Sequence, residues 1–110
     1  MENSLIKRYI AEAEAHGAGI LEENSKKSNQ SYDNLQKVYL EIKSLNRLED
    51  LKILLGHGNS SVRVWAATHL LPVSEEDSRS TLNDVAKEVT PIGFNAQMII
   101  NEWNAGKLKP

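Results

Sequence analysis

The chain has 110 residues, a length typical of a single domain. Its 13 Lys and Arg against 15 Asp and Glu give a formal net charge of −2 at pH 7, which offers no basic footprint for nucleic acid. The sequence contains no cysteine, so disulfides, thiolate nucleophiles and cysteine-based zinc sites are excluded.

Apolar residues recur at helical spacing through most of the chain, and no segment alternates as a strand does. The first helix is expected from about residue 4 to residue 21, although Gly17 weakens its interior. The polar stretch 23–31 indicates a loop. A second helix is expected over 32–45, where the amphipathic stripe consists of Leu35, Val38, Tyr39, Ile42 and Leu45.

Two short helices are expected in the middle of the chain. Asn46 suits both the end of the second helix and the cap of a third over 47–55, with Glu49 in a capping-box position. Asn59 or Ser60 can cap a fourth helix over 61–71, and Pro72 ends it.

The last two helices carry clear boundary signals. Ser74 is expected to cap the fifth, whose buried face would reach Val89. Thr90 followed by Pro91 predicts the start of the sixth, and Gly106 predicts its end.

An internal repeat relates these four helices. The fourth and sixth match at an offset of 30 residues, and the third and fifth at an offset of 31; the matched pairs are Val62–Ile92, Ala66–Ala96, Leu70–Ile100, Leu51–Leu82, Leu54–Val85 and Leu55–Ala86. Repeated helix pairs of this kind are typical of α-solenoids, in which about three pairs stack to bury their faces. We therefore predict an all-α fold of about six helices in three stacked antiparallel pairs. A single domain, 1–110, would contain a capping pair over 1–45 and repeat-like pairs over 46–72 and 73–106.

The segment LLGHGNSSVRVWAATHLLP, residues 54–72, resembles the second-helix pattern of HEAT repeats: a polar turn, then Val-Arg, then small alanines, then leucine. The most specific part is Val62-Arg63-x-Trp65-Ala66-Ala67. Together with IGFNAQMIINEWNAGKL, residues 92–108, it is similar to a family of short bacterial HEAT-like proteins of unknown function. The resemblance extends from about residue 48 to residue 108.

This resemblance implies a binding scaffold and not an enzyme. Some short bacterial members act as immunity proteins that neutralise a partner toxin, so an immunity or antitoxin-type role and a protein partner such as a toxin domain are expected. No cofactor is expected. The second helix of each pair would form the contact surface, whose expected residues are Tyr39, Arg63, Trp65, Phe94 and Gln97.

An alternative from another class is a small helical ribonuclease or nucleic-acid-binding protein that uses Arg63 and His69. Six residues at 100° per residue place the two side chains about 120° apart around one helix, so they would have to converge by distortion or across a dimer. Otherwise Arg63 would make a capping or carboxylate contact. A third alternative is a structural subunit of a larger assembly, which would expose a large apolar patch.

Metal and membrane sites are not indicated. His16, His57 and His69 lie in different elements and lack a metal-ligand spacing. No apolar run approaches the length of a membrane span, and the start MENSLIKRYI has no secretory signal pattern. With its lack of cysteine, the chain is expected in the cytoplasm.

Overall fold

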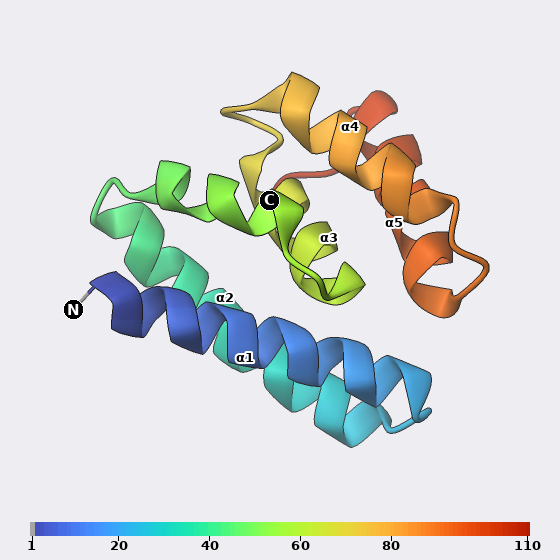
Figure 1. Ribbon diagram of the computed structural model, residues 1–110, viewed down its shortest axis with the longest axis horizontal. Coiled ribbons are helices and arrows are strands. Elements are labelled where there is room, and N and C mark those ends of the chain that lie inside the picture. Colours follow the sequence, from blue (N-terminus) through green and yellow to red (C-terminus); the bar gives the residue numbers. More distant parts are fainter. Residues whose placement is uncertain (1) are drawn as a thin grey trace.

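The computed structural model describes residues 2–110, so Met1 of the expected 1–110 domain lies outside the described residues. The elements are α1 (Glu2–Leu21), α2 (Ser25–Ser44), the 3-10 helix η1 (Leu48–Gly56), α3 (Ser60–Leu70), α4 (Glu75–Ala86) and α5 (Pro91–Asn104). α1 packs along α2 as a hairpin, η1 packs on α3, and α4 packs on both α3 and α5 (Figure 1). The predicted all-α class with six helices is confirmed, and the packing fits a helical bundle or a solenoid fragment.

The prediction of a loop over residues 23–31 is wrong, because α2 already begins at Ser25. The chain turns within three residues, with Glu23 at a positive φ of 55°, and the side chain of Asn24 caps α2 by accepting a hydrogen bond from the Lys27 backbone. A Cβ added to Gly19 would lie 2.8 Å from the Ser28 backbone nitrogen, so the two helices approach each other closely here. Glycine and serine occupy these contact positions, so the segment lacks the large apolar residues from which a helix is predicted.

The expected role of Asn46 as the cap of a third α-helix is also wrong. Asn46 takes a left-handed φ of 59°, and the Arg47 backbone N–H returns to the Ile42 carbonyl at 3.0 Å. This arrangement closes the end of α2. The next element is the 3-10 helix η1 over Leu48–Gly56, preceded by Arg47 without a side-chain cap.

The boundaries of α3 and α5 agree with the sequence. Asn59 accepts hydrogen bonds from the Ser61 and Val62 backbones, and Thr90 accepts one from Gly93 ahead of a helix that begins at Pro91. By contrast, α4 ends at Ala86, and Val89 is fully exposed and does not contribute to the buried face. Ser74 occupies the expected cap position of α4 without a side-chain hydrogen bond.

α3 is the central element, with eight of its 11 residues buried. One side of it, through Val62, Ala66 and Leu70, joins a core formed with the hairpin and η1. The other side, through Val64 and Ala67, joins a second core formed with α4 and α5. Because α3 carries apolar residues on two opposite faces and is buried on both, its sequence shows only a weak amphipathic pattern.

The matched repeat positions share their burial. Leu51 and Leu82 are both inaccessible, as are Ala66 and Ala96. In the remaining pairs the two residues also have the same burial. Both are buried in the pairs Val62–Ile92, Leu70–Ile100 and Leu54–Val85, and both are half-buried in the pair Leu55–Ala86. The two pairs differ in the type of their first helix, which is a nine-residue 3-10 helix in one and a 12-residue α-helix in the other.

We predict that Gly17→Ala destabilises the fold even though alanine favours helices. A Cβ at position 17 would lie 1.8 Å from Ser61 Oγ and 2.6 Å from Ser61 Cβ, so α1 and α3 would have to separate. Overpacking of this kind costs about 2 kcal/mol, measured as a loss in the free energy of unfolding in urea. Gly56→Ala is the control, because no atom lies within 4 Å of its added Cβ. Equal effects at both positions would contradict the close approach.

We predict that Ser78→Ala stabilises the chain. Ser78 in α4 is fully buried, and its Oγ has no hydrogen-bond partner among the described residues. A buried hydroxyl without a partner costs about 1 kcal/mol or more, so its removal should raise the free energy of unfolding by about that amount. Ser80→Ala, at an exposed position of the same helix, should leave stability nearly unchanged. A loss of stability in Ser78→Ala would show that the hydroxyl is satisfied.

Candidate functional site

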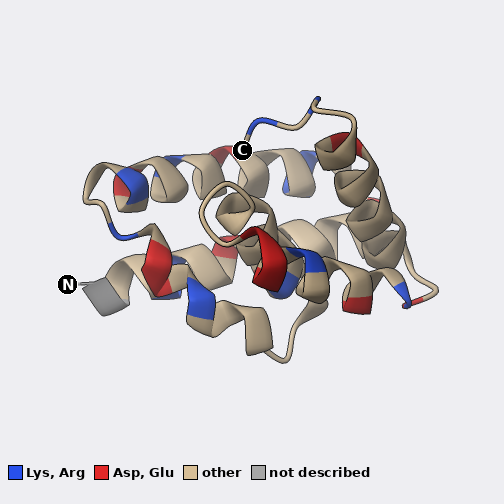
Figure 2. Cartoon of the chain, turned by 90° about the horizontal axis from the view of Figure 1, so that it is seen from above, with Lys and Arg blue, Asp and Glu red and all other residues tan. Residues whose placement is uncertain are grey.

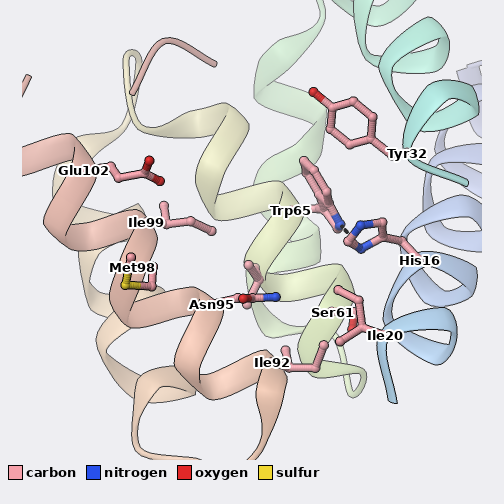
Figure 3. A pocket seen from close by; sticks show the side chains of 11 residues that line it. His16, Ile20, Tyr32, Ser61, Trp65, Ile92, Asn95, Met98, Ile99 and Glu102 are labelled. Carbon is pink, nitrogen blue, oxygen red and sulfur yellow. Dashed lines mark hydrogen bonds between the residues drawn. The ribbon is translucent and has the colours of Figure 1, made fainter. Parts of the chain in front are cut away.

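A cleft of about 280 Å³ opens between the hairpin and α5, with α3 as its floor. Figure 3 shows His16 and Tyr32 on the hairpin side, residues of α5 on the opposite side, and Trp65 of α3 between them. The lining is mostly apolar and consists of His16, Ile20, Tyr32, Ser61, Val64, Trp65, Ile92, Asn95, Met98, Ile99 and Glu102. The cleft therefore brings together side chains from all parts of the sequence except η1 and α4.

Aromatic rings form the hairpin wall of the cleft. The Trp65 ring lies 5.8 Å from the Tyr32 ring and 5.2 Å from the His16 ring, edge to face with the latter. The Trp65 indole N–H donates a hydrogen bond of 3.3 Å to Nδ1 of His16. Burial lowers the pKa of His16 below its ordinary value, which favours the neutral ring that can accept this bond.

His69 lies behind Trp65 in the protein interior and is 2% exposed. The Tyr39 ring stacks on it at 3.8 Å with an interplanar angle of 8°, and Trp65 flanks it at 5.5 Å. A hydrogen bond of 2.7 Å joins its Nδ1 to the Tyr9 hydroxyl. Burial lowers the pKa of His69 to about 3 and raises the pKa of Tyr9 well above its usual value, so both groups are neutral near pH 7.

These six rings form one aromatic cluster, made of Tyr9, His16, Tyr32, Tyr39, Trp65 and His69. Two of its rings come from α1, two from α2 and two from α3. The aromatic cluster therefore joins the hairpin to the central helix and fixes the inner wall of the cleft.

α5 provides the other wall, which ends at an exposed apolar surface. Met98 lines the cleft and is 42% exposed, and Phe94, four residues earlier on the same helix, is 67% exposed. The two side chains are neighbours on one helix face. Glu102 lies one turn beyond Met98. It is the one carboxylate of the lining, which contains no Lys or Arg and one histidine, His16.

The residues expected at a contact surface divide into separate groups. Trp65 lines the cleft and Phe94 lies beside it, whereas Gln97 is exposed on α5 and donates to Asn101 outside the lining. The expectation for Tyr39 is wrong: its ring is 4% exposed and packs in the core, because its polar edge and flat face suit the buried His69.

Arg63 lies apart from the cleft. Its guanidinium donates to the His57 carbonyl at 3.0 Å, to Ser60 Oγ at 3.0 Å and to the Glu88 carboxylate at 3.2 Å. It therefore makes the capping and carboxylate contact expected of it and ties the start of α3 to the end of α4. It borders a polar depression of about 300 Å³, formed with Leu55, Gly56, Ser80, Thr81 and Asp84.

Arg63 and His69 do not share a site. Arg63 is held by groups at the N-terminal end of α3, while His69 is enclosed by Tyr9, Tyr39 and Trp65 near the other end. A ring that is 2% exposed is not accessible to a phosphate on a second molecule either. The geometry for joint action on one bond, which the ribonuclease alternative requires, does not form.

Over residues 4–110 no group of three or more His, Asp or Glu side chains is arranged to hold a metal ion. None of the helices in the described part of the chain is long and apolar enough to cross a membrane. Lys and Arg are spread over several helices among Asp and Glu and do not gather on one of them (Figure 2).

Sequence reasoning missed His16, Tyr32, Met98 and Glu102. His16 and Tyr32 meet only through the register of the hairpin, which depends on the early start of α2. Met98 and Glu102 follow the stripe of Ile92 and Ile99 along one side of α5, which the sequence could have revealed as a wider apolar face.

No family model matches the chain, and no curated protein matches it. Among solved structures it is similar to the crystal structure of the protein RPA1889 from Rhodopseudomonas palustris. The TM-score is 0.90 at 19% identity, and the match covers 100% of this chain and 93% of the other. At this identity the likeness shows a shared fold alone.

We predict that acid destabilises the fold through His69. Because folding lowers the pKa of His69 from 6.5 to about 3, the unfolded chain binds a proton that the folded chain does not between these values. Above pH 6.5 His69 is neutral in both states and does not reduce the free energy of unfolding. As the pH falls below 6.5, the free energy of unfolding decreases by up to about 1.4 kcal/mol per pH unit. Urea unfolding between pH 7 and about 5, where most carboxylates stay ionised, measures this effect together with that of His16, whose pKa burial also lowers.

The test compares two glutamine variants. His69→Gln keeps a polar side chain for Tyr9 but does not titrate, so its stability should depend less steeply on pH than that of the native chain. Ser80→Gln, at an exposed position of α4, introduces a glutamine and leaves all three histidines in place, so it should keep the native slope. The same slope in all three proteins would contradict the role of His69.

Proposed function

We propose that this protein is a protein-binding module whose contact surface is the cleft together with Phe94 and Met98. One observation carries the proposal: an open, mostly apolar cleft continues into large exposed apolar side chains on α5. Tyr32, which is 42% exposed, lies at the opposite rim. Contiguous exposed apolar surface of this kind is characteristic of sites that bind another protein.

The composition of the cleft favours binding over catalysis. Its histidine is held by the Trp65 indole, and its one carboxylate has no second titratable group beside it in the lining. A general acid and base pair or an activated nucleophile requires two such groups within hydrogen-bond reach. The volume of about 280 Å³ is at the lower limit for small-molecule and cofactor pockets and suits one or two side chains of a partner.

The walls of the cleft are fixed before a partner arrives. Trp65 is held by its hydrogen bond to His16 and by ring contacts with Tyr32 and His69. A preformed surface loses little conformational entropy on binding, and a partly exposed tryptophan in a desolvated centre is a typical hot spot. These features support a stable complex from a small contact area.

The HEAT-like resemblance specifies the proposed partner further. We propose an immunity or antitoxin-type role, in which the surface covers a toxin domain in the cytoplasm. A structural subunit of a larger assembly would use the same apolar surface, and the two roles differ in whether the partner loses an activity on binding.

We predict that Phe94→Ala with Met98→Ala abolishes partner capture. Both side chains are exposed, so the double variant should keep the helical circular dichroism of the native chain while losing anchor residues that each contribute about 1–2 kcal/mol or more to binding. The measurement is affinity capture from the native host with quantification of each co-eluting protein.

The matched control is Leu40→Ala with Ile53→Ala, which removes two other exposed apolar side chains, 57% and 79% exposed, outside the cleft lining. This control should capture the same partner in the same ratio as the native chain. Capture of no protein in stoichiometric amount, or undiminished capture by the Phe94 and Met98 variant, would overturn the proposal.

A further inference from the structure

Glu102 is the one acidic side chain of the cleft lining, and it is exposed. Over residues 4–110 no side chain or backbone group donates a hydrogen bond to it, and no Lys or Arg forms an ion pair with it. Among the carboxylates over residues 75–102, Glu75 is engaged by Arg79 and Trp103, Glu88 by Arg63 and Ser60, and Asp84 by Lys87, whereas Glu76 and Asp77 are as unpaired as Glu102 but lie outside the cleft lining. Glu102 is therefore a negative charge at an apolar cleft without a counter-charge.

The surroundings of Glu102 favour a positive charge. The opposite wall presents the rings of Tyr32 and Trp65, whose π-electron faces attract cations. The lining contains no Lys or Arg, and the one histidine is kept neutral by burial. Segment 73–106, which forms α4 and α5, has six acidic and two basic residues, a formal net charge of −4, whereas the chain as a whole has −2.

We propose that the cleft binds an arginine side chain presented by the protein partner. This inference rests on the proposed function and specifies what its contact surface recognises. The aliphatic stem would lie along Met98 and Ile99, and the guanidinium would reach the Glu102 carboxylate across the Trp65 ring. Long basic side chains bury their stems on apolar surface in this way while the charged head stays at the rim.

Arginine fits this cleft better than lysine does. The guanidinium is planar and weakly hydrated, so it stacks on an aromatic face and tolerates a half-enclosed site, whereas the ammonium of lysine is strongly hydrated. It also pairs with a carboxylate through two parallel hydrogen bonds. The cleft volume of about 280 Å³ accommodates one such side chain with little space left.

The test uses two small probes of the same shape, of which one is a cation and the other is neutral and carries a carbonyl oxygen in place of one NH2 group. N-Butylguanidinium reproduces the end of an arginine side chain, and N-butylurea is its neutral counterpart of the same shape. Each is titrated into the native chain at low ionic strength, and the dissociation constant is read from ¹H–¹⁵N signals of residues 92–102. We expect butylguanidinium to bind about tenfold more tightly than butylurea, with a preference that shrinks as salt is added.

The variant Glu102→Gln should lose most of the preference for butylguanidinium, because it keeps the shape of the cleft and removes the charge, and only the weak attraction of the Tyr32 and Trp65 rings for the cation remains. Glu76→Gln is the control: Glu76 is an exposed carboxylate outside the lining, and its variant should keep the native preference. Equal affinities in the native chain, or an undiminished preference in Glu102→Gln, would overturn the arginine proposal. If partner capture still depends on Phe94 and Met98 in that case, the binding module stands and only its arginine specificity falls.

Discussion

The contact between α3 and the hairpin is the constraint on which the rest of the structure depends. Gly17 lets α1 approach Ser61 so closely that a methyl group would not fit. Further along α3, Trp65 and His69 are held among rings of the hairpin by stacking and by two hydrogen bonds. Because α3 also packs on α4 and α5 through its other face, it fixes the position of the hairpin relative to the last helix pair.

The cleft is a consequence of this arrangement. α1 meets α5 where Gly17 lies near Ile92, and beyond this contact the residues of α3 do not fill the space between the hairpin and α5, so a gap stays open above Trp65. The two histidines nearest to it are neutral, since burial lowers the pKa of both. The electrostatics of the site therefore come from Glu102 alone, against a background of apolar and aromatic groups. The binding role that we propose rests on this combination of an apolar shape and one charge.

The sequence predicts what depends on local periodicity, and it misses what depends on packing between distant elements. The apolar stripes, the caps at Asn59 and Thr90 and the equivalence of positions such as Ala66 and Ala96 are local signals, and the structure agrees with them. The start of α2 was missed because glycine and serine replace large residues where helices pack closely. Tyr39 was assigned to the surface because its partner His69 is 30 residues away and only the fold brings the two rings together.

Of the expected contact residues, Trp65 lines the cleft and Phe94 is exposed one turn before Met98 of the lining, whereas Gln97 lies outside the lining and Arg63 is engaged elsewhere. The central claim is that a partner binds over Trp65 and not over the rest of the surface. Once a partner has been identified, the indole ¹H–¹⁵N signals of the two tryptophans test this claim directly. The account predicts that partner binding shifts the Trp65 signal. The signal of Trp103, whose indole N–H donates a hydrogen bond to Glu75, should stay unchanged. A shift of Trp103 alone, or of neither tryptophan, would contradict it.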